Sequence, residues 1–219
     1  PRERIGPASC RAIRRGTVPT RTRSPVMAPP PEKLSVVVLG GGTVGAQVVR
    51  LLEEQSDEVV RSALEKAVDS SAHVVMINAG SSAGSKDFTV HIMKELGEVL
   101  VHGVAMMPGK PTILGVVKGK PVVGNPGYTV SSTLSFQQFV QPLLHTMQGL
   151  RPPKAKTIEV RPSRDLPSKL GVEEFLRVNI GKVGDKTVAT PLPRAAGSIT
   201  TLTRAEGILR IPALSEGIG

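Results

Sequence analysis

The chain has 219 residues and a formal net charge of +10, and 39% of its residues are hydrophobic. This length accommodates one α/β domain of ordinary size and a small second domain, while a content of 4 Phe, 1 Tyr and no Trp predicts an aliphatic core. We expect no membrane partner, because no apolar run approaches the ~20 residues that cross a bilayer.

Residues 1–33 carry eight basic side chains and only Glu3 and Glu32 as acids, so most of the net charge lies in this segment. The remaining charge is spread out, without interleaved aromatic residues for stacking on bases, and we therefore expect no nucleic-acid partner. The segment is rich in Arg, like a transit peptide, but it has no helical period. We expect a disordered basic tail, or sequence from an incomplete or misjoined reading frame. Its Cys10 is the one cysteine of the chain, which excludes an intrachain disulfide and favours the cytoplasm.

The run 35–39 is apolar and β-branched, which predicts a buried strand. Residues 40–45 then follow the pattern Gly-x-Gly-x-x-Gly and lead into a helix ending near residue 54, the context of a dinucleotide-binding turn. Residues 34–55 resemble the N-terminal segment of homoserine dehydrogenases, which implies a nicotinamide-dependent dehydrogenase as an alternative function. A structural strand–turn–helix is the other interpretation of Gly40 to Gly45.

The next segment, 57–70, predicts a helix instead of a second strand. Its inward-facing residues are Val60, Ala63, Leu64 and Ala67. A dinucleotide site requires an acidic residue at the end of the second strand, about 20 residues after the glycines. Glu65 has that spacing but falls within the predicted helix, which weighs against the dehydrogenase.

A glycine-rich loop over 78–87 follows the β-rich run 74–78 and precedes an amphipathic helix predicted to end at Leu96, with Gly97 as its stop. Gly80 and Gly84 have no Cβ, so their backbone amides can approach a ligand closely. The start of the following helix adds unpaired N–H groups and partial positive charge, which suit phosphate or an oxyanion.

Two further loops follow apolar runs in the same way. Gly109 and Lys110 lie between strands predicted over 99–105 and 112–117, and Lys110 adds a full positive charge. The loop 124–127 follows a strand at 122–123. Each loop alone is equally explained as a tight turn, but open α/β sheets bind ligands in such loops. The three together therefore predict an anion-binding site.

The rest of the chain predicts one long helix and a small β-domain. The helix covers 131–148, with a kink at Pro142. Its predicted buried residues are Leu134, Phe136, Phe139, Val140, Leu143, Leu144 and Met147. After a linker at 151–154, short alternating runs predict strands at 157–160, 175–180, 187–189 and 208–211.

From residue 57 to 219 the chain resembles the molybdopterin molybdenumtransferase family (the MoeA/gephyrin type). The matching segments, in the order of the family, are 78–89, 97–105, 108–111, 119–124, 126–127, 130–131, 171–175, 189–192 and 204–208. The resemblance implies a three-layer open sheet of the MogA/MoeA kind over 34–150, with an atypical first half, and a small β-barrel-like domain over 151–219. It also implies insertion of molybdate into adenylylated molybdopterin (molybdopterin-AMP) with release of AMP, a magnesium ion and a homodimer.

The resemblance also implies the site. Its catalytic residues are Asp87 and Lys110, and Asp87 also holds the metal. The cofactor-binding residues are Gly80, Ser81, Ser82, Gly84, Pro108, Gly109, Pro126 and Gly127. An N-cap role for Asp87 and a turn role for Ser82 remain open. Met107 replaces a lysine of many members, and Thr129 replaces a proline.

The family's Thr-Gly-Asp-Glu strand and its long N-terminal region have no counterpart before residue 57. We therefore expect an incomplete or divergent copy, which dimerises weakly or aggregates and turns over little substrate by itself. A non-catalytic binding module of the same fold is a third interpretation.

Overall fold

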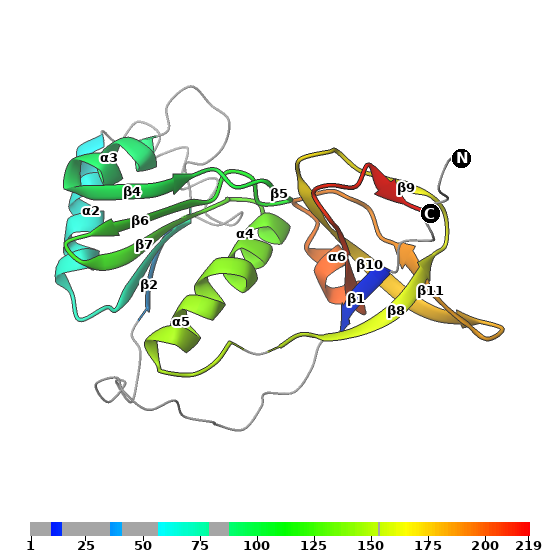
Figure 1. The fold of residues 1–219 in the computed structure, drawn as a ribbon. Coiled ribbons are helices and arrows are strands. Elements are labelled where there is room, and N and C mark those ends of the chain that lie inside the picture. The colour runs from blue at the N-terminus through cyan, green and yellow to red at the C-terminus, as the bar shows by residue number, and fades with distance from the viewer. Residues whose placement is uncertain (1–9, 15–35, 41–56, 79–87, 153) are drawn as a thin grey trace, which may run out of the picture. The chain divides into compact units, whose positions relative to one another are not determined.

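The computed structural model describes residues 10–14, 36–40, 57–78, 88–152 and 154–219 (Figure 1). The chain divides into two compact units. We call residues 21–104 with 109–152 the α/β unit, and residues 1–20, 105–108 and 153–219 the β unit. No helix in the described ranges is long and apolar enough to cross a membrane.

The α/β unit contains a five-stranded sheet in the order β2-β3-β7-β6-β4. Its strands are β2 (Val36–Gly40), β3 (Val74–Asn78), β7 (Lys120–Asn125), β6 (Ile113–Val117) and β4 (Gly97–His102). β2, β3 and β7 are parallel, whereas β6 is antiparallel to both β7 and β4. Four consecutive residues of β3 are buried, as expected for a parallel strand covered on both faces.

Helices cover the two faces of this sheet, which gives three layers (Figure 1). α2 (Asp57–Asp69) and α3 (Phe88–Leu96) pack on one face through Leu64 and Met93, both fully buried. On the other face, Val140 packs against Met76 of β3 and Val123 of β7. The predicted three-layer open sheet is therefore confirmed. The predicted inward position of Val60 is wrong, since its exposure is 37%.

Gly97 ends α3 by close packing rather than by an unusual backbone conformation. α3 ends at Leu96 and β4 begins at Gly97, as the predicted stop requires. However, Gly97 is not among the glycines with positive φ, so it is not a left-handed helix cap. A Cβ at Gly97 would lie 2.8 Å from Cα of Val117 in the neighbouring strand.

The predicted helix over 131–148 is interrupted. It comprises α4 (Thr129–Ser135), a π-helical turn η1 (Phe136–Val140) and α5 (Gln141–Met147), with Pro142 in the first turn of α5. Leu134 and Val140 are buried as predicted, but Phe136 is 37% exposed. A π turn adds a residue to the helical repeat and rotates the following side chains relative to a regular helix. Phe136 itself follows the buried Leu134 by two positions, or about 200° around the axis, so even a regular helix places it on the opposite face, and its predicted burial is wrong.

The β unit is built on a sheet that closes on itself. The strand order is β11-β8-β1-β12-β10-β5, and β11 also pairs with β10. The strands are β1 (Cys10–Arg14), β5 (Met106–Met107), β8 (Lys156–Pro162), β10 (Glu173–Val183), β11 (Lys186–Pro191) and β12 (Gly207–Ile211). β9 (Leu166–Pro167) and β13 (Gly217–Ile218) form a separate pair, and α6 (Ile199–Arg204) precedes β12. The predicted β-barrel-like domain is confirmed.

Strand β1 lies within the segment that we expected to be disordered. Cys10 pairs with Val160 of β8, and Ala12 pairs with Leu209 of β12. For residues 10–14 the expectation of disorder is therefore wrong, because pairing on both sides satisfies the backbone of an Arg-rich strand. The rest of 1–33 lies outside the described residues.

Two charged side chains of β10 are buried in the β unit, each with its own partners. Glu174 and Arg177 are each 2% exposed. Glu174 accepts hydrogen bonds from Ser168 and forms an ion pair with Arg194 at 3.1 Å. Arg177 donates to the carbonyl oxygen of Pro193 at 2.6 Å and to Oγ1 of Thr201 at 3.3 Å. Burial lowers the pKa of Arg177, and the charge of Glu174 opposes this effect.

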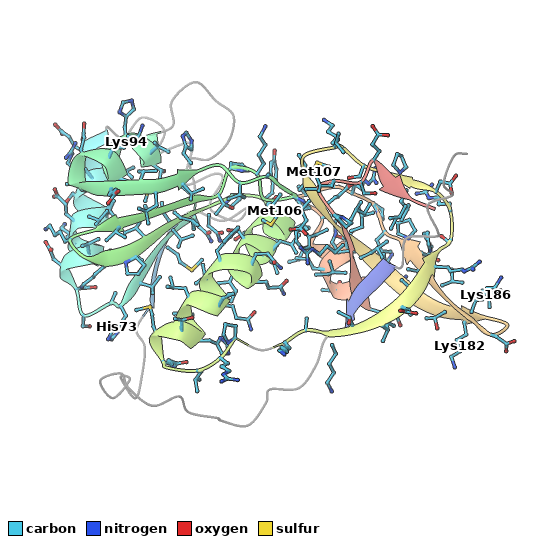
Figure 2. The ribbon with its side chains drawn as sticks, viewed as in Figure 1. His73, Lys94, Met106, Met107, Lys182 and Lys186 are labelled. Atoms are coloured by element: carbon cyan, nitrogen blue, oxygen red, sulfur yellow. The ribbon has the colours of Figure 1, made fainter. Side chains whose placement is uncertain are left out.

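The hairpin between β10 and β11 carries a basic tip. Figure 2 shows Lys182 and Lys186 near this tip. Val183 pairs with Lys186, and Gly184 makes the turn with φ of +59°. The strands predicted at 175–180 and 187–189 are confirmed, and both extend further toward this tip.

Candidate functional site

One edge of the five-stranded sheet gathers the loops that the sequence singled out. The parallel strands β2, β3 and β7 end there at Gly40, Asn78 and Asn125, which are register partners across the sheet. β6 runs the opposite way and begins at the same edge, since Ile113 pairs with Gly124. We call this end of the sheet the carboxyl edge. In open α/β sheets, ligands bind outside the carboxyl ends of the strands.

The loop before β6 brings Lys110 to the carboxyl edge. The carbonyl oxygen of Lys110 accepts a hydrogen bond from the Val104 amide at 2.8 Å, and the Gly103 amide donates to Thr112 at 2.9 Å. The main chain on both sides of Lys110 is thus held, while its side chain is exposed. A held main chain with a free ammonium group suits the binding of an anion in solvent.

Gly109 is structurally required in this loop. Its φ is +122°, a conformation that L side chains rarely adopt, and it is buried. Its carbonyl oxygen accepts hydrogen bonds from the amide of Thr112 at 3.1 Å and from Oγ1 of Thr112 at 2.8 Å. Pro108 and Met107 belong to the β unit, where Met107 lies in β5 and pairs with Glu174; both methionines of β5 are labelled in Figure 2.

The loop after β7 contains Pro126, which is buried, and Gly127, which is exposed. A Cβ at Gly127 would meet no atom within 4 Å, so packing does not require glycine there. The helix α4 begins immediately afterwards. Its N-cap residue, Tyr128, makes no side-chain hydrogen bond, so the amides of the first turn are not capped by that side chain.

Buried polar side chains lie directly behind these loops. Thr112 and Ser135 are fully buried, and their hydroxyl oxygens are hydrogen bonded at 3.0 Å. Asn125 is 2% exposed. Its Nδ2 donates to Oδ1 of Asn78 at 3.0 Å and to Oγ of Ser132 at 2.7 Å. These contacts join β3, β6, β7 and α4 at the carboxyl edge.

Sequence reasoning missed this polar layer. Asn125 stands at the end of the apolar run of β7, and Thr112 directly precedes the apolar run of β6. A polar residue adjoining a buried strand was the available signal, because burying such a group is costly unless it is hydrogen bonded.

Several residues of the predicted site cannot be placed. Gly80, Ser81, Ser82, Gly84 and Asp87 lie outside the described residues, as do residues 41–45 of the glycine pattern. Among the described residues, no group of three or more His, Cys, Asp or Glu side chains forms a metal site.

The topology also bears on the dinucleotide alternative. The strand after the glycine pattern is β3, which pairs in parallel with β2 and ends at Asn78. An acidic residue is required at that position to bind ribose hydroxyls. Glu65 lies within α2, so it cannot take this role.

Comparison with known proteins gives matches to both units. The family described as "Probable molybdopterin binding domain" matches residues 35–146, and the family described as "MoeA C-terminal region (domain IV)" matches residues 159–219. The first match includes β2 and its following residues. The resemblance of 34–55 to homoserine dehydrogenases is therefore wrong, and the dehydrogenase alternative is not supported.

Individual relatives agree with these families. A protein named "Putative molybdopterin biosynthesis protein" from Methanocaldococcus jannaschii is 32% identical over 160 residues, which cover 73% of this chain and 37% of that protein. A molybdopterin molybdenumtransferase of Haemophilus influenzae is 37% identical over 83 residues, covering 38% of this chain and 20% of that protein. The crystal structure of a molybdopterin biosynthesis MoeA protein from Pyrococcus horikoshii has a TM-score of 0.63 at 31% identity, covering 84% of this chain and 51% of that one. The chain thus spans about half or less of the length of these relatives.

Proposed function

The chain belongs to the molybdopterin molybdenumtransferase (MoeA) family, and we propose that it acts in molybdenum cofactor biosynthesis. Its substrates are adenylylated molybdopterin and molybdate, and the reaction inserts molybdate with release of AMP. The observation that carries the proposal is the convergence of the loops at the carboxyl edge of a domain matched as molybdopterin-binding. The dehydrogenase and the non-catalytic module have no such support.

In this proposal Lys110 binds the anionic part of the substrates. Phosphate and molybdate are oxyanions without hydrogen-bond donors when fully ionised, so they require cations and N–H groups. Lys110 supplies the cation, and the amides of the loop around Gly109 and at the start of α4 supply N–H groups. Pro126 and Gly127 border the same space, and the open surroundings of Gly127 leave room for a ligand.

We propose Gly80, Ser81, Ser82 and Gly84 as the second set of anion-binding residues, and Asp87 as the carboxylate that would hold magnesium. This assignment rests on the order of the family's motifs in the sequence. A bound magnesium ion would polarise the phosphate groups. No step is assigned to the ion, because the described residues provide no cluster of ligands for it.

We further propose that the protein is cytoplasmic and acts as a homodimer. Large apolar side chains are exposed on the α/β unit, among them Leu100 at 59% and Tyr128 at 64%. Exposed apolar surface promotes self-association. Light scattering over a range of protein concentrations checks this; a mass that remains that of the monomer would contradict it.

Calorimetric titration with AMP and with molybdate, each with and without magnesium, tests the proposed function. We expect Lys110→Ala to weaken anion binding about ten-fold or more, because a hydrogen bond to a charged group contributes roughly 1.5–3 kcal/mol. Lys94→Ala is the matched control. Lys94 lies in the last turn of α3, which leads into β4 where Gly97 pairs with Val117, at the opposite end of the sheet from Lys110. Equal effects of the two variants would show that the loss is one of general charge and not of a site at Lys110.

A further inference from the structure

We infer that Asn125 determines the specificity of the carboxyl edge by accepting a hydrogen bond from the neutral part of the ligand. The inference rests on the proposed function of that edge, and it assigns a role to Asn125, which is not among the predicted site residues. Its basis is the state of the two polar atoms of the Asn125 side chain.

The amide nitrogen of Asn125 is fully used within the protein. An Asn side chain has two N–H donors, and in Asn125 they are directed to Oδ1 of Asn78 at 3.0 Å and to Oγ of Ser132 at 2.7 Å. Oδ1 of Asn125 is consequently the free end of the side chain.

This oxygen is buried without a partner. Of all the side-chain nitrogen and oxygen atoms buried in the described part of the chain, Oδ1 of Asn125 alone has no hydrogen bond. Such an atom costs free energy, because it has lost water and gained nothing in exchange. Its neighbours along β7, Val122 and Val123, are apolar, and an apolar residue at 125 would avoid this cost.

The chemistry of the free atom defines what it can recognise. A carbonyl oxygen only accepts hydrogen bonds, so it repels fully ionised phosphate and molybdate, which likewise only accept. It recognises an N–H or O–H group. In adenylylated molybdopterin such groups occur on the pterin ring and on the nucleotide. Asn125 thus complements Lys110, which binds the anionic part.

Burial makes this contact selective. A site built to hydrogen-bond a donor discriminates strongly against an analogue that lacks it, because the buried acceptor is then left unpaired. Asn125 also connects β3, β7 and α4, so that the acceptor is held rigidly where the loops begin.

The test begins with binding of AMP and of neopterin to the full chain, measured by calorimetry. These probes represent the nucleotide and the pterin sources of the donor. If the wild-type chain binds neither probe nor molybdate, the proposed function of the edge fails. If it binds a probe, the variants below test Asn125 separately.

We expect Asn125→Leu to weaken the binding of one of the two probes by about 10- to 100-fold, as for the loss of a buried hydrogen bond. Its affinity for molybdate should stay within about three-fold of the wild-type affinity. Ser132→Ala is the matched control, since it removes a partner of Nδ2 but keeps Oδ1; we expect it to change probe affinity by less than about three-fold. Equal losses in both variants would overturn the inference and assign Asn125 a purely structural role. If Asn125→Leu does not fold, Asn125→Val replaces it.

Matched ligands identify the donor. AMP is compared with purine riboside 5′-monophosphate and with 2′-deoxy-AMP, and neopterin with the corresponding lumazine, which lacks the 2-amino group. Removal of the contacted donor should weaken binding to the wild type by the same factor as Asn125→Leu, and should have no further effect in that variant. If every analogue loses as much affinity for Asn125→Leu as for the wild type, Oδ1 does not contact the ligand and the inference is overturned.

Discussion

Asn78 and Asn125 stand side by side at the carboxyl ends of two parallel strands, and their side chains are hydrogen bonded at 3.0 Å. Each residue directly precedes a loop in which the family resemblance places ligand contacts. The pair therefore links the starting points of these two loops. This polar connection in an otherwise aliphatic sheet is the feature on which the specificity proposed above depends.

Thr112 should be important for stability because its hydroxyl is fully buried and bonded to both Gly109 and Ser135. Thr112→Val keeps the shape but leaves these partners unpaired. We expect the free energy of unfolding in urea to fall by about 1–3 kcal/mol. Thr133→Val removes a half-buried hydroxyl that bonds only to the Thr129 carbonyl oxygen, and it should cost less than about 1 kcal/mol. Equal losses of unfolding free energy in the two variants would contradict the stabilising role of the Thr112 hydroxyl.

Gly97 should not tolerate a side chain. Its Cβ would lie 2.8 Å from Cα of Val117, and the backbone of β6 would have to move. We expect Gly97→Ala to destabilise the protein by roughly 1–3 kcal/mol, as in other overpacked positions. Gly181→Ala is the control, because a Cβ there meets nothing within 4 Å. Thermal unfolding of both variants checks the difference, and an unchanged melting temperature for Gly97→Ala would be evidence against the close packing.

Substitution of Leu134 and of Phe136 should have unequal effects on stability, because positions two apart lie on opposite faces of a helix. Leu134 is 1% exposed and Phe136 is 37% exposed. Leu134→Ala should therefore lower the free energy of unfolding by about 2–5 kcal/mol. Phe136→Ala should lower it by clearly less, about 1 kcal/mol, since much of its surface already contacts solvent. A larger cost for Phe136 than for Leu134 would contradict the observed burial of Leu134.

Substitutions of two neighbouring glutamates in β10 should likewise have unequal effects on the free energy of unfolding. Glu174→Gln removes a buried carboxylate charge that accepts from Ser168, pairs with the half-exposed Arg194 and opposes the burial cost of Arg177, and we expect a loss of about 1–3 kcal/mol. Glu173 pairs with Arg210 at the surface, where the side chains are 27% and 58% exposed, so Glu173→Gln should cost less than about 1 kcal/mol. Chemical unfolding of the two variants measures the difference, and similar midpoints would contradict a structural role for the buried Glu174 carboxylate.

The pKa of Arg177 indicates whether Glu174→Gln raises or lowers the stability. Burial lowers the pKa of Arg177, so the folded protein binds this proton less tightly than the unfolded chain does. The charged side chain therefore opposes folding at pH values below its folded pKa. Glu174 reduces that cost, and its neutralisation must increase it.

The local sequence pattern was sufficient to predict most of the helices and strands and the positions of the loops. The β-branched run of β3, the apolar stripe of α2 that includes Leu64 and the glycine after α3 each depend on short-range preferences, and each was predicted close to its observed bounds. The order of the motifs was sufficient for the family, because glycine and proline loops at fixed spacing are specific to a fold and its ligand.

Tertiary contacts decided what short-range preferences do not encode. β1 forms from an Arg-rich segment because β8 and β12 pair with it on both sides. Asn125 became a candidate only when its two N–H groups were seen to be used and its oxygen was not. Whether a buried polar atom has a partner depends on residues distant in sequence, such as Asn78, so the sequence alone does not contain that information in readable form.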